Sequence, residues 1–98
     1  MTISKTLNEK ELVLAIEGRL DTTTAPELEN ELKICLDGVE NLILDLAALE
    51  YISSAGLRVV LAAQKTMSKQ GNMILKNVNE SVMEVFDITG MVDLLTIE

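Results

Sequence analysis

Two adjacent serines, Ser53 and Ser54, lie where the stretch "LILDLAALEYISSAGLRVVLAAQ" changes from a strand-like to a helix-like pattern. A hydrolase serine needs a general base, and the chain contains no histidine to provide one. A phosphoacceptor serine needs only exposure and tolerance of a dianion, which the free N–H groups and positive dipole end of a helix N-terminus provide. Serine is also a preferred N-cap residue, which explains one of the pair without any function. The residues themselves leave both roles open.

A second group of hydroxyl and carboxyl side chains occurs in "GRLDTTTAP". Asp21 either braces its own loop or contacts a partner, and the run Thr22, Thr23 and Thr24 supplies one helix cap and two further hydroxyls. Asp45 ends an apolar segment, where an aspartate more often satisfies loop N–H groups than does chemistry. Asp21 and Asp45 together are the one carboxylate pair that could serve as a general acid and base if they met at a strand edge.

The composition argues against several classes of function. With no His and a single Cys, the chain cannot assemble the usual zinc site or a Cys-His pair. A net charge of −8 and 2% aromatic residues disfavour binding to nucleic acid or anionic lipid. The segment "MTISKTLNEKELVL" lacks the apolar run of a signal peptide or membrane span, so a soluble cytoplasmic protein is expected. Cys35 is expected to be a small core residue, and no cofactor is expected.

The hydrophobic periods predict alternating strands and helices. Capping-box spacing is present at Thr24–Glu27 and again at Ser81–Glu84. Strands are predicted at 3–7, 11–18, 41–46, 72–77 and 92–97, and helices at 24–37, 55–70 and 80–89.

This order predicts a single α/β domain over residues 1–98. Its sheet should be small, mixed and mostly parallel, with four to five strands and three to four helices, and an antiparallel N-terminal hairpin. Functional loops of such sheets follow the carboxyl ends of strands. The loops "GRLDTTTAP" and "AALEYISSAG" should therefore converge at one edge.

Three segments resemble the STAS family, which includes the anti-sigma factor antagonists of bacteria. They are the serine stretch quoted above, "VLAIEGRLDTTTAPEL" and "SVMEVFDITGMVDLL". In this family an apolar strand leads through a short turn to Asp-Ser-Ser/Thr-Gly and an apolar helix. By position Ser54 matches the phosphoacceptor, whereas Ser53 stands where the family has aspartate.

The resemblance implies a cytoplasmic STAS fold that binds a kinase-type anti-sigma factor when unphosphorylated, releasing the sigma factor. The serine/threonine kinase then phosphorylates Ser54 and binding is lost, and a PP2C-like phosphatase restores it. Asp45 is expected to support the site structurally. The expected partner-binding residues are Asp21, Thr22, Thr23, Ser53, Ser54, Ala55, Gly56 and Arg58.

Two other functions compete with this one. The chain could be a non-switching STAS module in a transporter or lipid-transport complex. A small enzyme is the third class, and it would depend on the Asp21 and Asp45 carboxylates.

Overall fold

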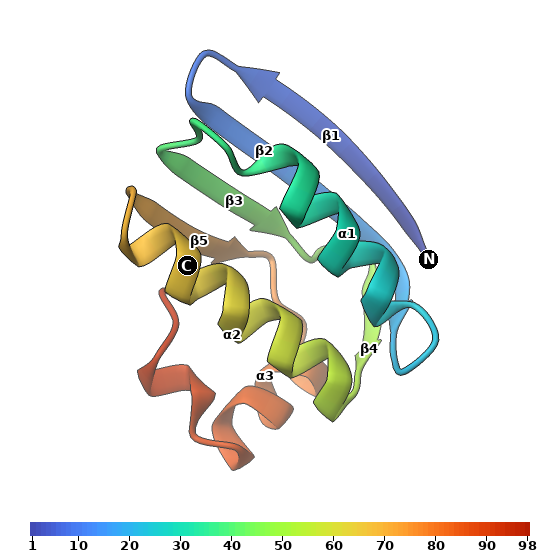
Figure 1. Ribbon diagram of the computed structural model, residues 1–98. Helices are drawn as coiled ribbons and strands as arrows, with labels where there is room; N and C mark the ends of the chain where they lie inside the picture. The colour runs from blue at the N-terminus through green and yellow to red at the C-terminus, as the bar shows by residue number, and fades with distance from the viewer.

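The computed structural model describes all residues from 1 to 98 as one five-stranded sheet with three α-helices and a short 3-10 helix (Figure 1). The mixed α/β prediction is confirmed. In chain order the elements are β1 (Thr2–Asn8), β2 (Glu11–Leu20), α1 (Ala25–Cys35), β3 (Asn41–Asp45), β4 (Leu49–Ile52), α2 (Ser54–Ser68), β5 (Asn72–Lys76), α3 (Glu80–Ile88) and η1 (Met91–Asp93).

The sheet has the order β1-β2-β3-β5, with β4 paired to β2 beyond the end of the β2–β3 ladder. β1 is antiparallel to β2, and the other pairs are parallel. This is the N-terminal hairpin and parallel sheet expected from the sequence. No helix is both long enough and apolar enough to cross a bilayer.

The core lies between the sheet and the helices α1 and α2, which cover one of its faces, and α3 adds Val82 and Phe86 to the same cluster (Figure 1). Leu14, Leu44 and Leu75 are adjacent in register on β2, β3 and β5, and each is fully buried. Leu12, Ile16 and Leu20 of β2 are buried in the same way, because alternate side chains of a strand point to the same face. Full burial of such a side chain stabilises the fold by about 1.5–3 kcal/mol.

Two strand predictions near the serines were incomplete. β2 does not end at Gly18 but passes through it with a φ of 100° and a register shift, and it then continues to Leu20. β4 was not predicted at all. Its four residues have buried ends and exposed middle positions, so they show neither the alternating pattern nor the length of a typical strand.

The predicted last strand at 92–97 was wrong except for a single bridge between Leu75 and Ile97. Met91 and Leu95 are both buried, and this spacing of four suits a helical turn, not the alternation of a strand. The segment accordingly starts with the 3-10 helix η1.

Neither predicted capping box forms. Thr24 is the N-cap residue of α1, but its hydroxyl donates to the Arg19 carbonyl at 2.7 Å and accepts from Asp21 N–H at 2.8 Å. α3 is capped by Asn79, which accepts from Val82 N–H at 2.9 Å. In both loops a different polar contact outcompetes the short-range motif.

Cys35 is half-buried at the end of α1, so it is less enclosed than expected. Its thiol donates to the Glu31 carboxylate at 3.3 Å. Burial, followed by the contact with Glu31, raises the pKa of the Cys35 thiol and keeps it protonated.

Candidate functional site

Ser53 is the N-cap of α2. Its backbone is extended, with φ of −98° and ψ of 176°, and its hydroxyl oxygen accepts from Gly56 N–H at 3.3 Å. Its own N–H donates to the Leu20 carbonyl at 2.9 Å, which continues the contact between β4 and β2. Ser53 is half-buried, and both its backbone and its side chain hold the helix start in place.

Ser54 is the first residue of α2 and is exposed. Its hydroxyl makes no hydrogen bond within the chain, since the cap is already provided by Ser53. The N–H groups of a first helical turn lack intrahelical acceptors, and the turn at Ser54 contains no acidic residue. A negative group on this side chain would therefore meet the positive end of the helix dipole and no nearby acid of its own turn.

Gly56 places this turn tightly against β2. A Cβ atom at Gly56 would lie 2.7 Å from Leu20 Cγ, 2.9 Å from Ile52 Cγ1 and 3.0 Å from the Leu20 carbonyl oxygen. Any larger residue would push the helix start away from the sheet. Gly56 is buried, so it positions the serines and offers almost no surface to a partner.

Asp21 braces its own loop, as one of the two alternatives proposed. Its Oδ1 accepts from Thr23 Oγ1 at 2.7 Å, Thr23 N–H at 3.0 Å and Thr24 N–H at 3.2 Å. These bonds, that from the Thr23 hydroxyl first, lower the pKa of the Asp21 carboxyl and keep it ionised. Thr22 is exposed between them and makes no hydrogen bond.

The two loops converge, as predicted, at a shallow hollow of about 250 Å³. It is lined by Thr22, Ala25, Pro26, Glu29, Ala55, Arg58 and Val59. Arg58 is exposed and forms no ion pair, so a free cation lies one turn after Ser54. The hollow can accept a side chain from another protein next to an unpaired charge.

Asp45 lies far from the serines along the direction of the strands. It is opposite Ala15 on β2, whereas Ile52, just before the serines, is opposite Leu20. The strand between these β2 positions rises roughly 16 Å at about 3.3 Å per residue. Asp45 therefore does not meet Asp21, and the carboxylate pair of a small enzyme is not assembled.

The contacts of Asp45 are structural. Its Oδ1 accepts from Ala47 N–H at 3.1 Å and from Asn77 Nδ2 at 3.0 Å. The Asn77 contact, followed by that from Ala47, lowers the pKa of the Asp45 carboxyl. Asp45 thus fixes the turn that leads into β4, and it supports the serine turn only through that connection. No group of three or more His, Cys, Asp or Glu side chains is arranged to bind a metal ion.

Sequence reasoning missed four residues around the site. Arg19 stacks on the ring of Tyr51, with its guanidinium carbon 4.2 Å from the ring centroid, and so ties β2 to β4 beside the loops. Glu29 and Val59 line the hollow from α1 and α2. Helical spacing could have indicated Val59 and Glu29 from the sequence. Val59 is four residues after Ala55, and Glu29 is four after Ala25, so the members of each pair lie on one helix face.

The chain is similar to known proteins over almost its whole length. The family model of the STAS domain matches residues 2–98. BtrV of Bordetella bronchiseptica, provisionally named an anti-sigma factor antagonist, is 39% identical over 88 residues, covering 88% of this chain and 76% of BtrV. The anti-sigma-B factor antagonist of Bacillus subtilis is 33% identical over 91 residues, covering 92% of this chain and 84% of that protein.

Solved structures share the fold at lower identity. An anti-sigma factor antagonist from Mycobacterium paratuberculosis superposes with a TM-score of 0.87 at 23% identity, over 98% of this chain and 83% of that one. The phosphorylated form of the Bacillus cell fate determinant SpoIIAA gives 0.76 at 18% identity, over 99% and 91%. A sulfate transporter family protein from Wolinella succinogenes gives 0.78 at 18%, over 93% and 75%.

The resemblance noted in the three sequence segments is therefore confirmed. Fold, family match and relatives agree over the same residues. The chain belongs to the STAS domain family.

Proposed function

We propose that this chain is an anti-sigma factor antagonist whose unphosphorylated form binds a kinase-type anti-sigma factor and so releases the sigma factor. Phosphorylation of Ser54 ends that binding. The class of function is supported by relatives that are named as anti-sigma factor antagonists. The observation that supports the switch is that the two serines at the start of α2 differ. Ser53 caps the helix, whereas Ser54 is exposed and its hydroxyl makes no hydrogen bond within the chain.

A phosphate on Ser54 would be tolerated by the domain but not by a docked protein. It adds about −1.5 to −2 charges at neutral pH, close to the positive end of α2. In a partner interface the same dianion is bulky and hard to desolvate, and badly matched charges cost several kcal/mol there. Since about 1.4 kcal/mol is a tenfold change in affinity, more than a hundredfold loss of binding follows.

Ser53 is the weaker candidate for phosphorylation, although it is also a hydroxyl. Its oxygen already accepts from Gly56 N–H, and the residue is half-buried. Modification of Ser53 would disturb a cap worth about 0.5–2 kcal/mol. This geometry supports Ser54 over Ser53 as the proposed acceptor.

The chain itself supplies no catalysis and no cofactor in this scheme. The anti-sigma factor kinase provides the nucleotide and the phosphoryl transfer, and a PP2C-like phosphatase removes the phosphate in the cytoplasm. Thr22, Thr23 and Arg58 contact the partner around Ser54, with Asp21 and Ala55 holding their loops. Thr22, Ala55 and Arg58 share one hollow, which supports grouping them.

The test is phosphorylation by the purified anti-sigma factor kinase of the same organism with labelled ATP, followed by peptide mass spectrometry. We expect one phosphate on Ser54 and none on Ser54→Ala. Ser53→Ala is the matched control and should still be labelled. Ser54→Asp should lose kinase binding while keeping its circular dichroism spectrum. Normal labelling of Ser54→Ala would refute the site.

A non-switching module of a transporter assembly is the second candidate, because the Wolinella sulfate transporter family protein shares this fold. Such a module needs no exposed acceptor, so Ser54→Asp would leave its assembly unchanged. The unengaged hydroxyl of Ser54 favours the switch.

A further inference from the structure

The surface around Ser54 is too small to be a complete protein interface. Stable interfaces bury about 800 Å² and about 20–30 residues on each partner. Of the residues expected to bind, Gly56 is buried and Ser53 half-buried, so the exposed part is a few side chains on two loops. A partner that docks on Ser54 must also contact a neighbouring surface.

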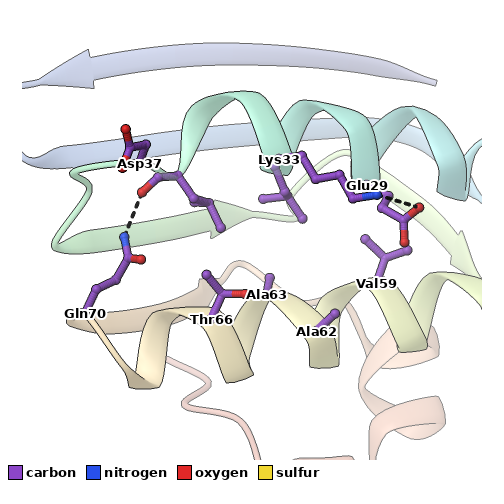
Figure 2. A pocket seen from close by; sticks show the side chains of 10 residues that line it. Glu29, Lys33, Asp37, Val59, Ala62, Ala63, Thr66 and Gln70 are labelled. Carbon is purple, nitrogen blue, oxygen red and sulfur yellow. Dashed lines mark hydrogen bonds and ion pairs between the residues drawn. The ribbon is translucent and has the colours of Figure 1, made fainter.

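A larger groove of about 370 Å³ adjoins this surface, between α1 and α2 (Figure 2). Glu29 and Val59 line both this groove and the hollow beneath the serine loop. The two depressions are therefore neighbours, and the groove lies next to the hollow that Thr22 and Arg58 line.

The groove has the surface of a protein-docking site. Its floor is apolar and almost fully buried, formed by Leu32, Leu36, Val59 and Ala63. Its mouth stays open because the exposed residues of α2 that border it are small, namely Ala62 and Thr66 (Figure 2). An aliphatic side chain inserted there would leave water for an apolar floor.

Polar contacts lie at the rim of the groove. At one end the Gln70 amide donates to the carbonyls of Leu36 at 2.7 Å and Val39 at 2.6 Å, which fixes α2 against the end of α1. Along α1, Glu29 and Lys33 pair at 3.8 Å (Figure 2). The Gln70 contact joins the two helices at one end of the groove, whereas the Glu29–Lys33 pair lies within α1.

The charges at its two ends give the groove a direction. Asp37 lies at the end far from Ser54, is exposed and has no ion-pair partner. Arg58, also unpaired, lies at the end near Ser54. A complementary segment presents an acidic residue at the Ser54 end, aliphatic side chains in the middle and a basic residue facing Asp37.

We infer that the α1–α2 groove is the second half of the partner interface. A segment of the same kinase-type anti-sigma factor places aliphatic side chains between Ala62 and the leucine floor, and a basic residue opposite Asp37. This rests on the proposed function, and it adds a contact that does not involve the phosphoacceptor. Affinity then depends on the groove, and switching depends on Ser54.

The experiment uses the full chain and, as probe, the purified anti-sigma factor kinase of the same organism that phosphorylates Ser54. Ala62→Trp fills the groove from an exposed position, and Ser68→Trp adds the same side chain on α2 outside the groove. Asp37→Lys reverses the charge at the groove end, and Glu84→Lys makes the same change on α3. Calorimetry or interferometry without ATP gives Kd, and circular dichroism checks the fold.

We expect Ala62→Trp and Asp37→Lys each to weaken binding about 10- to 30-fold, with both controls within about twofold of wild type. Ser54 should still be labelled in Ala62→Trp at high kinase concentration. If Ser54→Asp abolishes binding but both groove variants bind normally, the groove inference fails while the proposed function stands. If no anti-sigma factor kinase labels Ser54, both fail. If Ala62→Trp changes only self-association, seen by analytical ultracentrifugation, the occupant is a second copy and the inference is wrong.

Discussion

The two loops at the carboxyl ends of β2 and β4 contain similar residues but use them differently. In the β2–α1 loop, Asp21 gathers hydrogen bonds from Thr23 and Thr24, and the Thr24 hydroxyl also binds the Arg19 carbonyl. At the start of α2, a single hydroxyl, that of Ser53, does all the capping.

Each loop nevertheless leaves one hydroxyl unused, and these two belong to Thr22 and Ser54. The function of a hydroxyl here depends on whether the backbone already employs it, more than on the residue type. The β2–α1 loop uses its carboxylate to brace the backbone, whereas the cap of α2 leaves the Ser54 hydroxyl exposed.

Among the substitutions that test this comparison of the two loops, Gly56→Ala is expected to have the largest effect on stability. The added methyl would overlap Leu20 and Ile52, which destabilises the fold by about 1–3 kcal/mol even after a gain in helix propensity of about 1 kcal/mol. Urea unfolding measures the change. Stability equal to wild type would mean that α2 is not held against β2 as described.

Ser53→Ala and Ser54→Ala separate the capping serine from the free one. Loss of the Ser53 cap should cost about 1 kcal/mol of unfolding free energy, whereas Ser54→Ala should stay within about 0.5 kcal/mol of wild type. Chemical denaturation of both variants side by side gives the answer. Equal losses would show that the two serines share the cap.

The smallest effect is a pH dependence from the β2–α1 loop. The pKa of Asp21 is lowered in the folded chain from its ordinary value of 3.8, so its stabilising contribution is complete above that value. It is lost as the pH falls through the folded pKa. Wild type should therefore lose more stability than Asp21→Asn as the pH is lowered from about 4 through the folded pKa, as measured by thermal melts. Parallel pH curves for the two proteins would contradict the bracing role of Asp21.

Periodicity was enough to predict most elements of the fold. Strands at 11–18, 41–46 and 72–77 and all three helices were placed close to their observed bounds, because each buries one face or alternate residues in a regular pattern. The same logic failed where an element was too short or packed in an unusual way. β4 has no alternation, and Met91 and Leu95 are spaced for a turn.

The position of the candidate site could be predicted from the sequence, but the hydrogen bonds among its residues could not. Loops after strand ends were expected to converge, and Thr22 and Arg58 do share one hollow. Asp45 was expected to support the site structurally, and in the structure it accepts a hydrogen bond from Asn77, which lies on a loop far along the chain. The match of Asp45 alone to the family pattern gives no information about a partner so distant in the sequence.

The sequence by itself determined the succession of strands and helices, the net negative charge, the lack of histidine and the family. These depend on residue types and short-range spacing, which a chain carries in any conformation. Only the tertiary structure decided that Ser53 caps while Ser54 is free, that Gly56 must stay small against Leu20, and that a groove lies between α1 and α2. Such features arise where backbone groups and side chains distant in sequence come within hydrogen-bonding or packing distance.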